Sequence, residues 1–228
     1  MNETLLFSEN STQDCCAVLL RGGRSRRMGG RDKALLPWKE STFLETIASQ
    51  LDFLEEKYLS VAASDDSKTG DPNGQNSPGI LSADWIRLPD LIPDCGPLGG
   101  IYTALATCKA QWALVVSCDV PAVEESFFKM LLAQRSQEAD IIYPLTPDGR
   151  MHMTCAVYRK SIAPLLLQQL EKGDNRLRVL PELCRAKAIR IEQPDLVRML
   201  SNINTNEELK RILYYYKADI KPDSILKD

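Results

Sequence analysis

Short apolar runs alternate along the chain with longer segments in which apolar residues recur at helical spacing. The continuous apolar runs are typical of buried strands and fall at residues 15–20, 58–63, 85–88, 112–117, 141–144, 154–158 and 188–191. The helical spacing covers residues 42–56, 98–108, 124–134, 162–170 and 177–184, with a last helix from residue 205. Strands that alternate with helices predict a mostly parallel α/β sheet with helices on both faces.

Turn and cap residues add detail to this pattern. Residues 147–150 (PDGR) predict a turn that joins two strands as a hairpin, so we expect one antiparallel element in the sheet. Ser41 is the expected N-cap of the helix over 42–56. Thr205 with Glu208 three residues later predicts a capping box at the start of the last helix.

The same reading divides the chain into one domain and two tails. Residues 1–14 and 217–228 are polar or charged and are expected to be flexible. Residues 15–216 form the predicted domain, because no linker or internal repeat divides them. Within it, residues 64–84 are rich in Asp, Gly, Pro, Ser and Asn, which predicts a long flexible loop.

Composition excludes several classes of protein. The 228 residues carry a net charge of −3, whereas a general nucleic-acid binder is expected to have a positive net charge. No apolar run reaches the ~20 residues of a membrane span, and the first residues lack a secretory signal, so we expect a cytoplasmic protein. The seven cysteines include no C-x-x-C pair, which favours reduced, buried thiols. The single histidine, His152, excludes a zinc site built on two histidines.

The first candidate site is a basic, glycine-rich loop that directly follows the strand at 15–20. Residues 21–33 hold five arginines and one lysine against one aspartate, a local charge of +5, together with four glycines. Glycine lets backbone N–H groups approach an anion, and arginine and lysine neutralise it, so the loop favours a polyphosphate over a merely solvated charge cluster. The P-loop and the dinucleotide fingerprint are both absent.

The second candidate is Asp119, which follows the strongest buried strand at 112–117. A carboxylate beside a phosphate loop is a natural ligand for Mg²⁺, and the alternative is an N-cap for the helix after Pro121. Cys118 is a weaker candidate, as a catalytic thiol.

With these motifs identified, the sequence resembles the molybdenum cofactor guanylyltransferases of the nucleotidyltransferase superfamily. Four motifs occur in order: LRGGRSRRMGGRDK at 20–33, GPLGG at 96–100, CDVP at 118–121 and NINTNEEL at 202–209. Arg21 stands where the family has alanine. The resemblance covers residues 17–209 and implies a Rossmann-like three-layer fold, similar to the nucleotide-diphospho-sugar transferases.

The resemblance also implies roles for individual residues. Backbone contacts to the guanosine, a phosphate contact by Lys33 and a Mg²⁺ ligand in Asp119 are implied, with further nucleotide and pterin contacts. The implied catalytic residues are Asp119, Lys33 and Arg27; the implied binding residues are Leu20, Arg21, Gly22, Gly23, Lys33, Asp90, Asp119, Asn202 and Asn204.

The implied reaction is transfer of GMP from GTP to the phosphate of molybdenum-molybdopterin, with release of pyrophosphate. Proteins that deliver the pterin or act as molybdoenzyme chaperones are implied partners, and nucleic acid and membranes are not. Two alternatives stay open. One is a cytidylyl or sugar-phosphate nucleotidyltransferase of the same fold, against which Gly22 and Gly23 favour guanine. The other is a non-catalytic GTP-binding or adaptor protein.

Overall fold

The computed structural model describes residues 12, 14–21, 32–62 and 81–217, except for the side chains of Asn206 and Lys217. The N-terminal segment expected to be flexible, most of the 64–84 loop and nearly all of the C-terminal segment lie outside these ranges. In the described residues, no helix combines the length and the apolarity that crossing a membrane requires.

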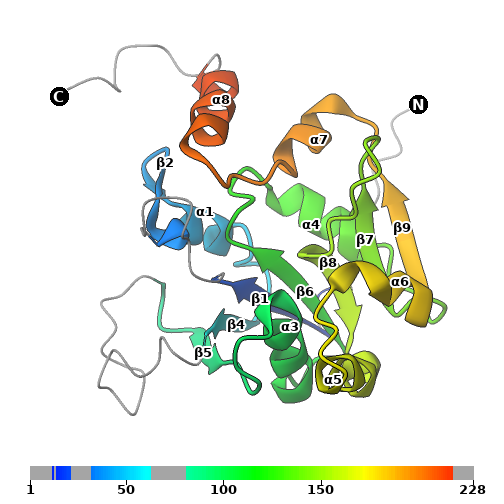
Figure 1. Ribbon diagram of the computed structural model, residues 1–228. Coiled ribbons are helices and arrows are strands. Elements are labelled where there is room, and N and C mark those ends of the chain that lie inside the picture. The colour runs from blue at the N-terminus through cyan, green and yellow to red at the C-terminus, as the bar shows by residue number, and fades with distance from the viewer. Residues whose placement is uncertain (1–11, 13, 22–31, 63–80, 218–228) are drawn as a thin grey trace.

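A seven-stranded sheet forms the centre of the molecule, in the order β5-β4-β1-β6-β8-β7-β9 (Figure 1). Its strands are β1 (Cys15–Leu20), β4 (Glu56–Val61), β5 (Trp85–Pro89), β6 (Trp112–Ser117), β7 (Ile141–Leu145), β8 (Cys155–Arg159) and β9 (Ala186–Arg190). Only the pairings of β8, with β6 and with β7, are antiparallel. The predicted fold class, including the hairpin that reverses β8, is confirmed.

Helices cover both faces of the sheet. They are α1 (Phe43–Ser49), α3 (Gly96–Thr107), α4 (Glu125–Leu132), α5 (Ala163–Glu171), α6 (Leu180–Leu183), α7 (Pro194–Met199) and α8 (Asn206–Lys217), with 3-10 turns η3 (Lys33–Leu35), η4 (Lys160–Ile162) and η5 (Leu177–Val179). The side chains of β1 alternate between the two faces: Ala17 and Leu19 pack with α1 and α4, and Val18 and Leu20 pack with α3 and α5. This alternation explains why the strand sequence is apolar throughout.

Two boundaries differ from the prediction for the first helix. The helix over 42–56 was predicted too long, since α1 ends at Ser49. Leu51 and Leu54 continue the helical spacing, but they lie in the turns after α1, where their side chains are buried. The predicted N-cap Ser41 is wrong, because Thr42 caps α1 in a capping box with Glu45, and Ser41 only adds a hydroxyl bond to the same carboxylate.

Near the C-terminus the structure holds more elements than the sequence indicated. The helix predicted at 177–184 is divided into η5 and the four-residue α6. The strand predicted at 188–191 begins two residues earlier, and α7 was not predicted. The capping box at Thr205 is confirmed, because Thr205 Oγ1 accepts from the N–H of Glu208 and Glu208 Oε2 accepts from the N–H of Thr205.

A third, smaller hydrophobic cluster joins α8 to a short hairpin, β2 (Pro37–Trp38) with β3 (Ser41–Thr42). Trp38 is its centre: the ring is 1% exposed and meets Phe43 and Tyr216 edge-on, at centroid distances of 5.9 and 5.6 Å. The packing ties the segment just after the basic loop to the C-terminal helix, about 170 residues later in the chain.

Candidate active site

The candidate site lies where β4, β1 and β6 end side by side. In register, Leu20 at the end of β1 is opposite Ser60 of β4 on one side and Ser117 of β6 on the other. The carboxyl ends of parallel strands are the usual place for a ligand in such a sheet. Each of these two serines donates a hydrogen bond to an aspartate, and the two pairs mark the two halves of the site.

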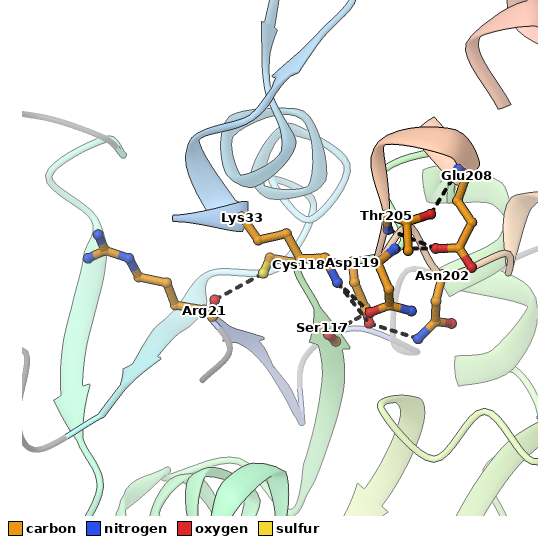
Figure 2. A network of polar contacts seen from close by, with 9 residues as sticks. Arg21, Lys33, Ser117, Cys118, Asp119, Asn202, Thr205 and Glu208 are labelled. Atoms are coloured by element: carbon orange, nitrogen blue, oxygen red, sulfur yellow. Dashed lines mark hydrogen bonds and ion pairs between the residues drawn. The ribbon is translucent and has the colours of Figure 1, made fainter. Parts of the chain in front are cut away.

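Asp119 is the centre of the first half. Its Oδ1 accepts a hydrogen bond from Ser117 Oγ at 2.6 Å, and its Oδ2 accepts one from Asn202 Nδ2 at 2.7 Å. The Lys33 ammonium lies 3.7 Å from Oδ2, with both side chains about one-sixth exposed. Figure 2 shows Lys33 and Asn202 directed at this carboxylate from different segments of the chain. These contacts fix the position of a negative charge at the carboxyl end of β6.

Lys33 is held from a second side. Its Nζ donates to Asn204 Oδ1 at 2.7 Å, so the lysine bridges the asparagine and Asp119. Asn204 is itself fixed by the start of α8, because its N–H donates to Glu208 Oε2 at 2.6 Å. Glu208 of the capping box thus fixes Asn204, and Asn204 in turn fixes Lys33.

Arg21 directs its side chain away from Asp119 (Figure 2), and its guanidinium binds Asp32 Oδ2 through Nη2 at 2.7 Å. The backbone of Arg21 is also engaged: its N–H donates to Ser60 O at 3.1 Å, and its carbonyl accepts from Cys118 Sγ. The Arg21 guanidinium therefore adds no cation at Asp119.

Asp90 belongs to the second half of the site. It follows β5 and faces the first turn of α3, and Ser60 Oγ donates to its Oδ1 at 3.1 Å. Burial raises the pKa of this carboxyl above its usual range, and the hydrogen bond from Ser60 acts in the opposite direction.

Two alternative readings of the 118–121 motif are not supported by the geometry. Burial raises the pKa of Cys118 to about 12, and the negative charge of Asp119 acts in the same direction. This thiol is therefore not an activated nucleophile. Asp119 is not a helix N-cap, because α4 begins at Glu125 and its N-cap residue is Glu124.

His152 lies in the strand-to-strand connection next to this edge. The residue is 7% exposed, and its Nε2 is 3.1 Å from Thr146 Oγ1. Burial lowers its pKa to about 4, with Arg150 acting in the same direction and the carboxylates of Asp148 and Asp119 acting against it. The imidazole is therefore neutral at pH 7.

In the Asp119 half of the site, among the described residues, Asp119 supplies the carboxylate oxygens that a hard cation prefers. Among the described residues, no three His, Cys, Asp or Glu side chains are grouped as a metal-binding set. Mg²⁺ is commonly bound through one or two carboxylates while substrate phosphates and water complete its shell. Asp119, with the Lys33 cation already beside it, fits that donor pattern.

The structure brings four of the predicted residues together: Lys33, Asp119, Asn202 and Asn204. Leu20 and Arg21 adjoin them, and Asp90 lies on the other side of β1. Gly22, Gly23 and Arg27 lie outside the described residues. The sequence analysis missed Ser60 and Ser117, although each is the one polar residue near the end of an apolar strand, and Ser117 shares the strand side of Asp119 two positions on.

Comparison with known proteins adds the family. A family model described as a MobA-like NTP transferase domain matches residues 17–187. The chain belongs to the MobA-like NTP transferase family. Asn202 and Asn204, which contact Asp119 and Lys33, lie beyond the matched range.

Curated relatives and solved structures agree with this family. A probable molybdenum cofactor guanylyltransferase from Methanothermobacter thermautotrophicus is 36% identical over 88% of this chain and 99% of its own. One from Flavobacterium johnsoniae is 27% identical over 84% of this chain and 92% of its own. The crystal structure of molybdopterin-guanine dinucleotide biosynthesis protein A from Archaeoglobus fulgidus superposes with a TM-score of 0.70 at 19% identity, covering 89% of this chain and 99% of the other, which confirms the nucleotidyltransferase fold.

Proposed function

We propose that this MobA-like nucleotidyltransferase transfers GMP from GTP to the terminal phosphate of molybdenum-molybdopterin. The observation that carries the proposal is the Asp119 carboxylate, fixed by Ser117 and Asn202 beside the Lys33 ammonium at the sheet edge. The relatives named as molybdenum cofactor guanylyltransferases support guanine as the base and the pterin as the acceptor.

The reaction needs little acid–base chemistry. An oxygen of the pterin phosphate forms a bond to the α-phosphorus of GTP, and the bond from that phosphorus to the α,β-bridging oxygen breaks. Pyrophosphate leaves, and the guanine dinucleotide form of the cofactor remains. A phosphate monoester is already ionised near neutral pH, so catalysis consists of positioning and charge stabilisation. A site with a neutral, buried His152 and one fixed carboxylate suits such a reaction.

The residues of the chain divide this work between them. Lys33 contacts the phosphates and neutralises charge that develops on the leaving pyrophosphate, and Arg27 in the basic loop adds to that neutralisation. Asn202 and Asn204 keep Asp119 and Lys33 in place and lie toward the pterin. Leu20, Arg21, Gly22 and Gly23 lie along the guanosine through their backbone, with Asp90 beside the nucleoside.

A divalent cation, here Mg²⁺, belongs to this proposal. Asp119 would hold it, and it would supply charge stabilisation on the phosphates when bound. In the part of the chain that the structure describes, the Lys33 ammonium faces the same carboxylate.

The cellular setting completes the proposal. The seven thiols are free in the structure, which supports a reducing compartment such as the cytoplasm. Residues 15–216 act as one domain, since one sheet includes β1 and β4 to β9 and α8 packs against the separate β2–β3 hairpin. Proteins that deliver the pterin or that insert the finished cofactor are the proposed partners.

The test is a pyrophosphate-release assay with molybdenum-molybdopterin, Mg²⁺ and each of GTP, CTP, ATP and UTP. GTP should be used at least about tenfold more efficiently than the others, since an unpaired buried polar edge costs ~1–3 kcal/mol. A preference for CTP would indicate a cytidylyltransferase. Tight GTP binding without pyrophosphate release would indicate a GTP-binding adaptor.

A further inference from the structure

The carboxylate of Asp90 lies next to the nucleotide side of the site and has few hydrogen-bond partners among the described residues. In the described part of the chain, the only hydrogen bond to this carboxylate comes from Ser60, to Oδ1. An ionised carboxylate has about four acceptor positions, and a half-buried one with a single donor is poorly compensated. Its raised pKa has the same cause.

The backbone around Asp90 leaves the carboxylate little freedom to move away. The N–H of Asp90 donates to Val61 O at 3.0 Å, and the next N–H, of Leu91, donates to Thr103 Oγ1 at 2.9 Å. Thr103 is fully buried in α3, and its hydroxyl donates to Gly99 O at 2.9 Å. The segment is therefore fixed to β4 on one side and to α3 on the other.

Gly100 shows how closely the Ser60 hydroxyl is placed. A Cβ at Gly100 would lie 2.4 Å from Ser60 Oγ and 3.4 Å from Asp90 Oδ1. Real Cβ atoms do not approach an oxygen this closely, so any side chain here would displace the hydroxyl from its bond with Asp90. This contact gives a physical reason for the last glycine of the GPLGG motif.

Ser60 also belongs to the nucleotide side of the site. It is opposite Leu20 in the register of β1 and β4, and its carbonyl accepts the N–H of Arg21 at 3.1 Å. One residue thus connects the turn after β1, where the guanosine is proposed to bind, with the carboxylate of Asp90.

We propose that Ser60 is a positioning residue: its hydroxyl occupies Oδ1 of Asp90 and thereby presents Oδ2 to a hydrogen-bond donor of the bound nucleoside. The proposal rests on the proposed function, because it takes GTP as the ligand. GTP offers two kinds of donor, the ribose hydroxyls and the N–H groups of guanine, and both would satisfy a carboxylate oxygen.

The experiment compares wild-type protein with Ser60→Ala in GTP binding by calorimetry and in steady-state kinetics. We expect Ser60→Ala to weaken GTP binding about five- to twentyfold and to raise KM similarly, with kcat within about twofold of wild type. Ser49→Ala is the matched control, because its exposed hydroxyl on α1 only caps its own helix, and it should leave binding unchanged.

Nucleotide analogues distinguish positioning from a merely structural role. The same measurements are made with 2′-deoxy-GTP, 3′-deoxy-GTP, ITP and ATP. The first two lack one ribose hydroxyl, ITP lacks the guanine amine, and ATP lacks both the guanine amine and the N1–H. The Ser60→Ala penalty should disappear for each analogue that lacks the donor bound by Asp90, and the pattern identifies the donor. An equal penalty for all five nucleotides, or none for GTP, would overturn the inference.

A second variant keeps the test valid if Ser60→Ala does not fold. Asp90→Asn removes the charge while preserving shape, and Ser60→Cys in the wild-type and Asp90→Asn backgrounds forms a double-mutant cycle. Ser60→Cys should weaken GTP binding in the wild-type background and have less effect in the Asp90→Asn background; equal effects would contradict the proposal. Failure of the wild-type protein to bind GTP at all would overturn the proposed function itself, a separate and recognisable result.

Discussion

At the scale of single residues, the candidate site consists of a few charged side chains whose positions are fixed by hydrogen bonds. Asp119 receives hydrogen bonds on both oxygens, from Ser117 and Asn202, and Lys33 is bound by Asn204. Because these side chains are already in position, little free energy is needed to reorganise them when charge develops on a phosphate. Their removal should therefore affect the reaction more than the stability of the fold.

Asp119→Asn should reduce the rate of pyrophosphate release by about 100- to 1,000-fold, the usual loss for one preorganised charge contact. The amide has the size of the carboxylate, so the melting temperature should change by only a few degrees. Turnover near that of wild type at saturating Mg²⁺ would show that Asp119 is not the metal ligand.

Lys33→Ala should raise KM for GTP and lower kcat, with a combined loss in kcat/KM of roughly ten- to a hundredfold. The reason is the loss of one charged hydrogen bond, worth about 1.5–3 kcal/mol. Lys172→Ala is the matched control, because Lys172 is an exposed lysine at the end of α5. A Lys33→Ala protein with unchanged kinetics and a lower melting temperature would make the lysine structural.

Four residues around Asp119 were predictable because each lies within a recognisable sequence motif after a strand or before a helix. They are Lys33, Asp119, Asn202 and Asn204. Ser60 and Ser117 were not predictable, since a serine in an apolar strand gives no signal of what its hydroxyl meets. Ser117 bonds to Asp119 two positions on, but Ser60 bonds to Asp90 thirty positions on, across β4 and β5. Such contacts depend on the register between neighbouring strands, which cannot be read directly from the sequence.

At the scale of elements, α8 is part of the site through its first turn. Glu208 Oε2 accepts hydrogen bonds from the N–H groups of both Asn204 and Thr205. The helix also packs its apolar side on Trp38, next to the segment that holds Lys33. The packing of α8 on Trp38 therefore fixes both segments that the Lys33–Asn204 hydrogen bond joins.

Glu208→Ala should lower kcat severalfold and lower the melting temperature by about 2–4 °C, because a lost helix cap costs ~1 kcal/mol. The kinetic loss follows from release of Asn204, which no longer holds Lys33. Glu207→Ala is the control: Glu207 is exposed in the same helical turn and should leave both measurements unchanged. A fall in melting temperature with unchanged kcat would limit Glu208 to a capping role.

The elements that the sequence predicted well are those with strong apolar runs, such as β1 and β6, whose bounds match the prediction. The helix at 42–56 was too long because Leu51 and Leu54 are buried by tertiary packing, and periodicity alone does not distinguish this from helix. The helix α7 was missed because its six residues include one proline and two charges. The two-residue strands β2 and β3 are set by the turn between them and by Trp38.

At the scale of the whole molecule, the single histidine links stability to pH. The pKa of His152 is lowered from about 6.5 to about 4 in the folded protein. The unfolded chain therefore binds more protons between these values, and stability falls as the pH drops from about 6.5 to about 4. The contribution is on the order of 2–3 kcal/mol over this window.

The measurement is denaturant unfolding at about pH 7, 6, 5 and 4.5 without divalent cations, for wild type and His152→Gln. The wild-type free energy of unfolding should fall more steeply below about pH 6.5 than that of the variant. Because the chain has one histidine, its imidazole signal in NMR is unambiguous, and a midpoint near the ordinary value of about 6.5 would contradict the buried, neutral assignment.

The bond between Lys33 and Asn204 joins residues 171 positions apart. A ribosome that adds about 5–20 residues per second needs roughly 10–30 s to travel between them. During that interval the sheet strands up to β9 can pair, but Trp38 and Phe43 lack the α8 residues that cover them. A nascent chain of this protein therefore acquires a folded body before it acquires a working site, and it exposes an aromatic surface to chaperones until its last helix has been synthesised.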